Sequence, residues 1–244
     1  MRNLRLDICY DGTRYKGFQR LPGCDNTIQG KLEMTLSRLL GETIEVSGSG
    51  RTDAGTHAQN QVVSFHCESG MSCQEILEGL QAYLPEDIGV YSCRNVSPRF
   101  HARLHALEKT YRYRVWNSCD PCVFDRKYVY TDRTVYDVQR MDAAAQQFVG
   151  THDFSAFCGN KHMKKSTVRT IKSFSVEQKG HEIVFLVTGN GFLQHMVRIM
   201  VGTLLEIGAG QREAASISNL FGAQRSLAGP AVPACGLCLM EVTY

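Results

Sequence analysis

The order in which hydrophobic patterns change along the chain constrains its fold more than any other feature. In the first half, alternating patterns typical of strands and patterns with a helical period follow one another as strand, helix, strand, strand, helix, strand. The predicted strands cover 4–9, 43–47, 61–67 and 88–96, and the predicted helices cover 27–40 and 76–84. Gly41 and Pro85 follow these helices, and Ser72 and Glu75 have the spacing of a capping box before the second one. The first half therefore predicts a βαββαβ unit.

The second half repeats this order with longer connections. Its predicted strands cover 110–116, 170–177, 182–188 and 236–242, and its predicted helices cover 137–149, 192–207 and, as a short addition, 212–220. The halves share little residue-level similarity, so the duplication rests on the order of elements alone. Two βαββαβ units predict an α+β fold of two ferredoxin-like halves, 1–105 and 106–244, whose antiparallel sheets form one extended sheet with a central basic cleft.

Several features of the composition favour a soluble cytoplasmic protein. The sequence has no apolar leader segment and no run of about 18 apolar residues that would cross a bilayer. Its ten cysteines are scattered along a chain too long and too apolar to need disulfide bonds, which favours reduced thiols. CxxC spacings at 119–122 and 235–238 leave a zinc or redox site as an alternative, although residues three apart on a strand point to opposite faces.

Basic residues gather in two stretches, although the net charge is only +3. The first stretch contains Arg94, Arg99, Arg103, Lys109, Arg112 and Arg114, opposed by Glu108, and the second contains Lys161, Lys164, Lys165 and Arg169. Such clusters suit a phosphate backbone, and the alternative is two solvated faces. Charge alone therefore leaves nucleic acid binding open.

The strongest local motif is the glycine-rich run 48–58, between the second and third predicted strands. Its glycines allow tight turns and close approach to a ligand, and it carries a single carboxylate, Asp53. The spacing is not that of a dinucleotide-binding loop, and no helix follows it. Taken alone, the run also fits an Asx turn in which Asp53 bonds its own backbone.

The run 50–58, GRTDAGTHA, resembles the signature GRTDAGVHA of the TruA family of tRNA pseudouridine synthases. The resemblance extends along the chain through 10–19, 27–29, 100–103, 109–113, 152–157, 191–198 and 233–237. The occurrence of these segments together and in order is far more specific than any one of them. Phe18 stands where the family usually has tryptophan, and Thr56 where it usually has valine, and neither position takes part in the expected chemistry.

This resemblance implies an isomerase that converts uridine to pseudouridine at positions 38, 39 and 40 of the tRNA anticodon arm and works as a homodimer. The reaction breaks the bond between uracil N1 and ribose C1′, turns the base and joins C5 to C1′, so no cofactor or metal is expected. A carboxylate either attacks covalently or helps to remove the ribose 2′ proton, and the sequence leaves both routes open. The family's catalytic carboxylate corresponds here to Asp53.

Two further catalytic residues follow from the resemblance. Arg198 is expected to pair with Asp53 and keep it ionised, and Tyr111 to stack on the extruded uracil and serve as a general base. The alternatives are a snorkelling helix residue for Arg198 and a core aromatic for Tyr111.

The resemblance also implies three substrate-binding residues. Arg51 is expected to help flip the target nucleotide, which must leave the stack because its glycosidic bond is otherwise unreachable. Leu237 is expected to line the base pocket, and the alternative is a position in the core. His57 is expected to be the third substrate-binding residue. The competing functions are a non-catalytic RNA-binding protein, a cysteine-based metal or redox protein, and a synthase acting on another RNA.

Overall fold

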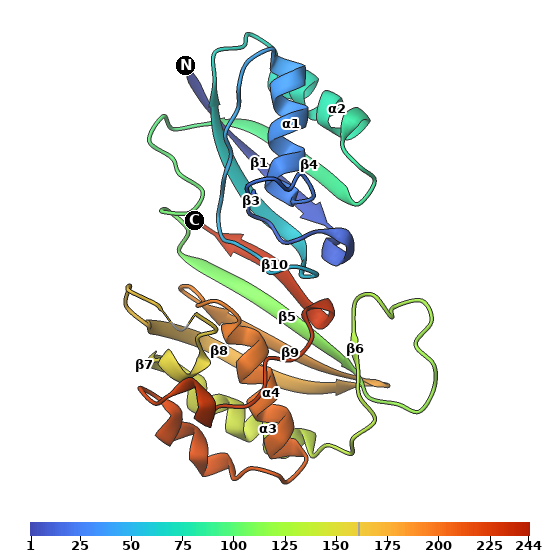
Figure 1. Ribbon diagram of the computed structural model, residues 1–244, viewed down its shortest axis with the longest axis vertical. Helices are drawn as coiled ribbons and strands as arrows, with labels where there is room; N and C mark the ends of the chain where they lie inside the picture. Colours follow the sequence, from blue (N-terminus) through green and yellow to red (C-terminus); the bar gives the residue numbers. More distant parts are fainter. Residues whose placement is uncertain (161) are drawn as a thin grey trace. The chain divides into compact units, whose positions relative to one another are not determined.

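The structure, a computed structural model, describes residues 1–160 and 162–244 (Figure 1). Lys161, which the sequence places in the second basic stretch, lies outside the described residues. Contacts between Cα atoms divide the chain into two compact units. Unit 1 comprises Met1–Leu107 together with Leu239–Tyr244, and unit 2 comprises Glu108–Cys238. Within the described ranges, every helix is too short or too polar to span a membrane.

Unit 1 contains a sheet with two helices. Its elements are β1 (Arg2–Tyr10), η1 (Gly12–Arg14), α1 (Ile28–Leu40), β2 (Ser47–Gly48), β3 (His57–Cys67), α2 (Cys73–Tyr83) and β4 (Ile88–Val96). β1 lies between β4 and β3 and pairs antiparallel with both, and β2 pairs antiparallel with β3. The last strand of the chain, β10 (Leu237–Thr243), is also a neighbour of β3. The strands predicted at 61–67 and 88–96 are confirmed.

Helices α1 and α2 begin and end where their capping residues predict. The side chain of Thr27 accepts the N–H of Gly30, and Gly41 ends α1 with a φ of 71°. Ser72 and Glu75 form both hydrogen bonds of a capping box at the start of α2. These caps satisfy main-chain groups that a helix leaves without an internal partner. The predicted helices of the first half are therefore confirmed.

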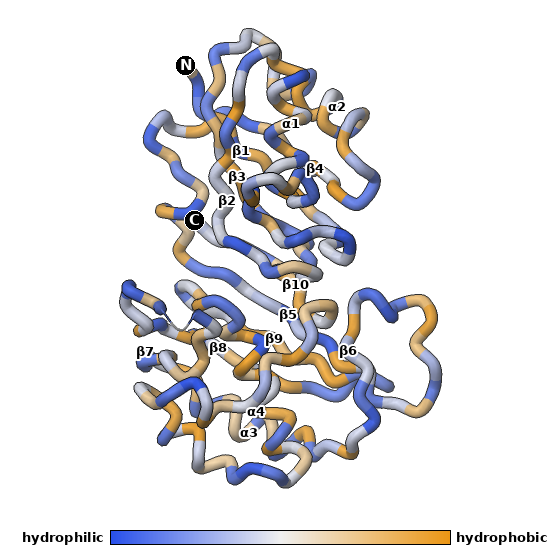
Figure 2. Tube along the Cα trace, in the orientation of Figure 1, coloured by the Kyte–Doolittle hydropathy of each residue, from blue (hydrophilic) through white to orange (hydrophobic). Residues whose placement is uncertain are grey.

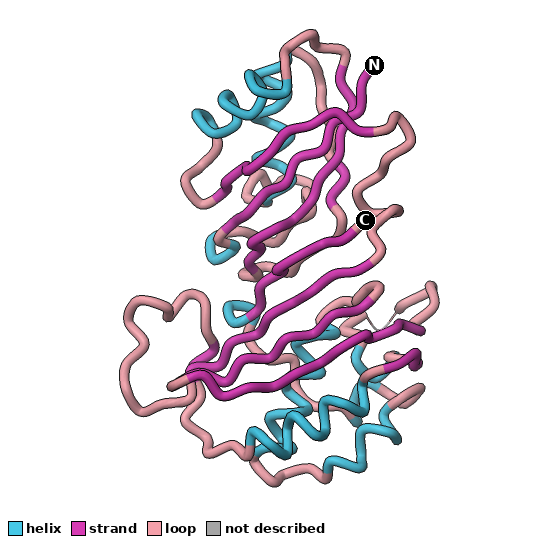
Figure 3. The backbone as a smooth tube through the Cα atoms, turned by 180° about the vertical axis from the view of Figure 1, so that it is seen from behind, coloured by secondary structure: helices cyan, strands magenta, loops and turns pink. Residues whose placement is uncertain are grey.

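The core of unit 1 lies between its sheet and its two helices, which cover one face of the sheet (Figures 1 and 3). The fully buried residues come from alternate positions of β1 and from the inner faces of the helices: Leu4, Leu6, Ile8, Ile28, Leu32, Leu36, Ile76 and Leu80. This alternation matches the twofold side-chain period of a strand. Removal of this apolar surface from water stabilises the unit.

The strand predicted at 43–47 is wrong for most of its length, because β2 contains only Ser47 and Gly48. The N–H of Ile44 donates to Ser37 Oγ at 2.9 Å, and the N–H of Val46 donates to Glu33 Oε1 at 3.0 Å. Side chains of α1 thus satisfy main-chain groups that a neighbouring strand would otherwise pair. Ile44 and Val46 are buried even so, which explains why their alternation resembles a strand.

Unit 2 also contains a sheet covered by helices. Its first elements are β5 (Glu108–Trp116), β6 (Tyr130–Thr131), α3 (Val138–Ala145), η2 (Gln146–Phe148), β7 (Gly150–Asp153), η3 (Ser155–Phe157) and β8 (Val168–Lys179). Its later elements are β9 (Glu182–Gly189), α4 (Met196–Gly208), η4 (Ala214–Leu220), η5 (Arg225–Leu227) and η6 (Ala234–Gly236). The strand order is β5-β9-β8-β7, all antiparallel, and β6 pairs parallel with β5. The chain is therefore α+β with mainly antiparallel pairing, as predicted.

Helix α4 is the most apolar helix of unit 2, and hydrophobic residues run along it and along β9 in Figure 2. The sequence predicts a helix from 192, but α4 begins at Met196, after His195 with a left-handed φ of 60°. A carbonyl just before this residue, that of Gln194, accepts the N–H of Gly159. A tertiary contact thus holds 192–195 outside the helix.

Candidate functional site

Residues 49–56 connect β2 to β3 and carry Asp53. The connection turns at 53–56, where the N–H of Thr56 donates to the carbonyl of Asp53 at 3.1 Å and Gly55 adopts a φ of 77°. Main-chain atoms therefore close this turn, at a backbone conformation that glycine adopts without strain. Asp53 is half-buried and Arg51 is exposed. The carboxylate thus occupies a position partly shielded from bulk water.

Thr52, the residue before Asp53, anchors the loop to residues 10–19, the first motif of the family resemblance. Its carbonyl accepts the N–H of Phe18 at 3.1 Å, and its Oγ1 lies 2.9 Å from the hydroxyl of Tyr10 in a buried hydrogen bond. At the start of the loop, the N–H of Ser49 donates to the carbonyl of Val62 at 2.7 Å. Buried hydrogen bonds of this kind fix a segment, because breaking one leaves a polar group without a partner. The sequence did not predict this role for Tyr10 or Thr52.

Close packing of glycines explains why residues 10–19 and 48–56 lie against each other. A side chain at Gly17 would lie 2.9 Å from the carbonyl oxygen of Thr52, and Gly17 also has a φ of 97°. A side chain at Gly48 would overlap the ring of Phe18. Phe18 is buried at 3% exposure, so it packs in the position where the family usually has tryptophan.

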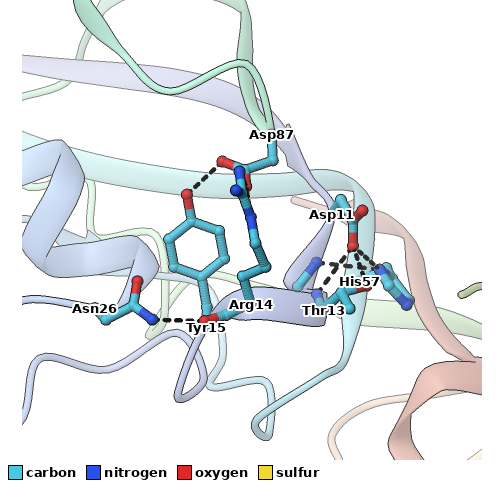
Figure 4. Close-up of polar contacts among 8 residues, drawn as sticks. Asp11, Thr13, Arg14, Tyr15, Asn26, His57 and Asp87 are labelled. Atoms are coloured by element: carbon cyan, nitrogen blue, oxygen red, sulfur yellow. Dashed lines mark hydrogen bonds and ion pairs between the residues drawn. The ribbon is translucent and has the colours of Figure 1, made fainter.

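His57 lies at the start of β3 with its ring directed at η1 (Figure 4). Its Nδ1 accepts the N–H of Gly12 at 3.1 Å and lies 3.2 Å from Asp11 Oδ1. Asp11 Oδ1 also accepts the N–H and the hydroxyl of Thr13. The imidazole is buried at 5% exposure, so these contacts hold η1 next to the Asp53 loop.

Asp87 holds the other end of η1 (Figure 4). Its Oδ2 accepts from Arg14 Nε at 3.0 Å and from Nη2 at 2.6 Å, and its Oδ1 accepts the hydroxyl of Tyr15. Burial, followed by the hydrogen bond to Asp87, raises the pKa of Tyr15, so this phenol stays protonated and donates at neutral pH. Arg14 and Tyr15, both within the first motif, therefore have structural partners inside unit 1.

In unit 2, Tyr111 lies on β5 at 7% exposure. Its ring meets that of Phe192 edge to face, with centroids 5.0 Å apart and planes at 81°. Phe192 lies in the segment before α4, so this aromatic pair links β5 to the beginning of that helix. Aromatic pairs in this geometry fix the orientation of both rings.

Arg198 lies in the first turn of α4 and is half-buried. Its Nε donates to the carbonyl of Val232 at 2.7 Å. The adjacent carbonyl, of Pro233, accepts the hydroxyl of Tyr113 at 2.8 Å. The guanidinium thus fixes the segment that leads into β10, where Leu237 is buried at 6% exposure.

The six predicted site residues fall into two groups. Arg51, Asp53 and His57 lie together at the entrance to β3 in unit 1, and the other three, Tyr111, Arg198 and Leu237, belong to unit 2. Across residues 1–160 and 162–244, no cluster of histidine, cysteine or carboxylate side chains has the makings of a metal site. All ten cysteines are free thiols.

Comparisons with known proteins agree on one family. A family model described as tRNA pseudouridine synthase matches residues 8–103 and 144–244. A protein of Bacillus cereus named tRNA pseudouridine synthase A 2 is 42% identical over 245 residues, and one of Bacillus sp. (strain KSM-64) named tRNA pseudouridine synthase A is 44% identical over 245 residues. A protein of Clostridium tetani named tRNA pseudouridine synthase A 1 is 43% identical over the same length. Each alignment covers 100% of both chains.

Proposed function

The chain belongs to the tRNA pseudouridine synthase family, and we propose that it isomerises uridine to pseudouridine in the anticodon arm of tRNA, at positions 38, 39 and 40, with Asp53 as its catalytic carboxylate. The observation that carries the assignment is the environment of Asp53. This residue is half-buried in a loop that hydrogen bonds of Ser49 and Thr52 anchor before it and that the bond from Thr56 N–H to the Asp53 carbonyl turns after it. A carboxylate held in this way needs little reorganisation before it reacts.

The proposed reaction moves the bond between the base and the ribose from N1 to C5 of the uracil. The N1–C1′ bond breaks, the uracil turns within the pocket, and a C5–C1′ bond forms. The proton on C5 leaves, and N1 gains a proton, so the substrate and product have the same composition. Asp53 either forms a bond to the substrate or helps to remove the ribose 2′ proton. The isomerisation involves no net oxidation or reduction, which is why the chain's own side chains suffice.

We place Arg198, Tyr111 and Leu237 at the same site as Asp53. This proposal takes the chain as two ferredoxin-like subdomains, 1–105 and 106–244, that form one extended sheet with a basic cleft at its centre. The bond from Arg198 to Val232 supports it, because this bond holds one edge of the guanidinium in a defined orientation. The burial of Tyr111 and Leu237 suits a pocket that packs against the flat faces of a base.

Arg51 and His57 act from the loop itself. Arg51 is exposed, as is required of a side chain that enters the RNA stack when the target nucleotide leaves it. The contacts of His57 with Gly12 and Asp11 indicate that it supports the loop from within unit 1. Its contribution to substrate binding is therefore made through the position of its neighbours.

We further propose a cytoplasmic homodimer. The free cysteines suit a reducing compartment. The segment 117–129, which precedes β6, exposes Phe124 at 94% and Val123 at 55%. Apolar side chains with this exposure suit a surface that a second subunit or the RNA covers.

Replacement of Asp53 by asparagine tests the function directly. Asp53→Asn keeps the size of the side chain, so we expect normal folding and tRNA binding but no release of tritium from C5-labelled uridine in unmodified tRNA. Asp25→Asn makes the same change at an exposed position of unit 1 and should behave as wild type. Retained turnover in Asp53→Asn would remove that residue from its assigned role. Mapping of pseudouridine by nucleotide tests the three target positions.

A further inference from the structure

Unit 2 contains an open pocket of about 780 Å³ that the predicted catalytic residues do not line. One wall comes from η3 and the described residues of the connection to β8, within 155–160 and 163–167, and the other comes from 223–226, which includes the start of η5. Its volume lies within the range of about 300–1,000 Å³ that is typical of ligand pockets. It is therefore large enough for part of a nucleotide chain.

The pocket is positively charged. Lys164, Lys165 and Arg225 line it, and no carboxylate is found among its described lining residues. Within the described part of the chain, neither lysine has an ion-pair partner. Two carboxylates lie close to this lining without being part of it. Asp153 accepts the hydroxyl of Thr167 at 2.6 Å, and Glu206, which accepts Arg212 Nε at 2.7 Å, also acts electrostatically on Arg225. The cations of the pocket are therefore only partly offset by the chain's own carboxylates.

The walls of the pocket are held in place by Asp153. Its Oδ1 accepts the N–H of Ser155 at 3.0 Å in addition to the Thr167 hydroxyl, and its carbonyl accepts the N–H of Gly222 at 2.9 Å. Ser155 Oγ donates to the carbonyl of Ala223 at 3.2 Å. These bonds link the two walls, so the arrangement of polar groups is set before a ligand arrives.

The chemistry of the lining selects the kind of ligand. The cations lie among hydroxyl and amide groups of Ser155, Thr167 and Asn160, and the lining residues that the structure describes include no aromatic side chain on which a base could stack. Lysine, arginine and small polar side chains are the groups that contact phosphate and sugar rather than base edges. Partial burial also lowers the pKa of Arg225, so a bound anion would offset the cost of holding that charge away from water.

We propose that this pocket binds backbone phosphates of the tRNA, away from the nucleotide that is isomerised. The inference rests on the proposed function, because tRNA supplies the phosphates. The wall of the pocket that contains η3 is connected to α4, the helix that carries Arg198. The N–H of Gly159 donates to the carbonyl of Gln194, just before α4, at 2.8 Å. Phosphates held here would fix the register of the RNA without reading its sequence.

A charge-matched pair of variants tests the proposal. Lys164→Gln/Lys165→Gln removes two cations from the pocket, and Lys31→Gln/Lys179→Gln removes two from α1 and the end of β8. The affinity of each protein for unmodified tRNA is measured at several salt concentrations. We expect the pocket variant to bind about 10-fold more weakly, with a slope of log K against log salt that is smaller by about 1–2. The control pair should keep the wild-type slope.

Turnover separates phosphate binding from catalysis. The pocket variant should release the C5 proton at the wild-type single-turnover rate, within about twofold, once tRNA is saturating, because the lost contacts act equally on ground and transition states. An affinity and slope equal to those of the control pair would overturn the proposal, and so would a lower saturating rate with unchanged affinity. Arg225→Gln provides a second variant. We expect it to weaken tRNA binding as well and to reduce the slope of log K against log salt by half as much as the double lysine variant, because it removes one cation instead of two.

The same experiment keeps the two proposals apart. If wild-type protein isomerises uridine while the pocket and control variants bind tRNA alike, the pocket inference fails and the proposed function stands. If wild-type protein binds tRNA through the pocket lysines but releases no C5 proton from any uridine, the proposed function fails and the phosphate site stands.

Discussion

Replacement of Gly12 by alanine should displace Asp53, although Gly12 itself lies outside the proposed site. An ideal Cβ on this residue would lie 2.0 Å from the carbonyl oxygen of Thr56, whereas real Cβ contacts are essentially never under 3.0 Å. Either η1 or the turn 53–56 must therefore move by about 1 Å. Thr56 N–H is bonded to the carbonyl of Asp53, so a shift of the turn moves the proposed catalytic residue with it.

The expected effects have two magnitudes. Overpacking of this kind costs about 1–3 kcal/mol of the free energy of unfolding. For a chain of this length, that lowers the melting temperature by about 2–4 °C per kcal/mol. A 1 Å displacement of a catalytic group can slow a reaction by about 100-fold. We therefore expect Gly12→Ala to lose more in the single-turnover rate at saturating tRNA than its stability alone would explain.

Gly70→Ala is the matched control, because a Cβ there meets nothing within 4 Å and Gly70 has no positive φ. Its stability should change by less than about 0.5 kcal/mol, with a normal rate. Thermal unfolding followed by circular dichroism and release of C5 tritium measure the two effects. A Gly12→Ala protein that melts and turns over like Gly70→Ala would refute the reasoning. Normal turnover in a destabilised Gly12→Ala protein would show that the turn does not control the rate.

Two further predictions concern Arg198 and thiol chemistry. If Arg198 acts at the same site as Asp53, as proposed above, Arg198→Ala should slow isomerisation at saturating tRNA and Arg198→Lys should restore part of the rate; an Arg198→Ala protein with the wild-type single-turnover rate would contradict that placement. Burial, followed by the neighbouring Cys73, raises the pKa of Cys93 to about 12. Iodoacetamide at pH 8 should therefore label the exposed thiol of Cys119 well before that of Cys93 in the folded protein, which mass mapping would show. Equal labelling of the two thiols would contradict the burial of Cys93.

Local signals in the sequence predicted most of the secondary structure. Gly41, Pro85 and the Ser72–Glu75 box predicted the end of α1 and both ends of α2, because such signals depend on residues a few positions apart. The same reasoning could not find the true start of α4, which depends on a distant contact of Gln194, or the loop at 43–46, whose amide groups bond to Glu33 and Ser37. The short strands β6 and β7 have too few residues to show a period.

The site residues came from a different kind of information. Periodicity alone made Tyr111 and Leu237 core residues and Asp53 a turn residue, and the resemblance to a family supplied their roles. The supporting contacts of Tyr10 with Thr52 and of Asp87 with Arg14 escaped both approaches. Each of these pairs joins residues more than forty positions apart. The partner of a tyrosine hydroxyl or a carboxylate at that distance cannot be identified from a single sequence.

The assignment of Leu239–Tyr244 to unit 1 has a consequence for synthesis on the ribosome. The carbonyl of Thr243 accepts the N–H of Leu107, and the hydroxyl of Tyr244 donates to the carbonyl of Ala102. Unit 1 is therefore completed only when Leu239–Tyr244 are made, about 7–30 s after Leu107 at about 5–20 residues per second. A nascent chain keeps the edge of β3 open during that interval, and a copy terminated early never closes it. The fold of unit 1 thus depends on the synthesis of all of unit 2.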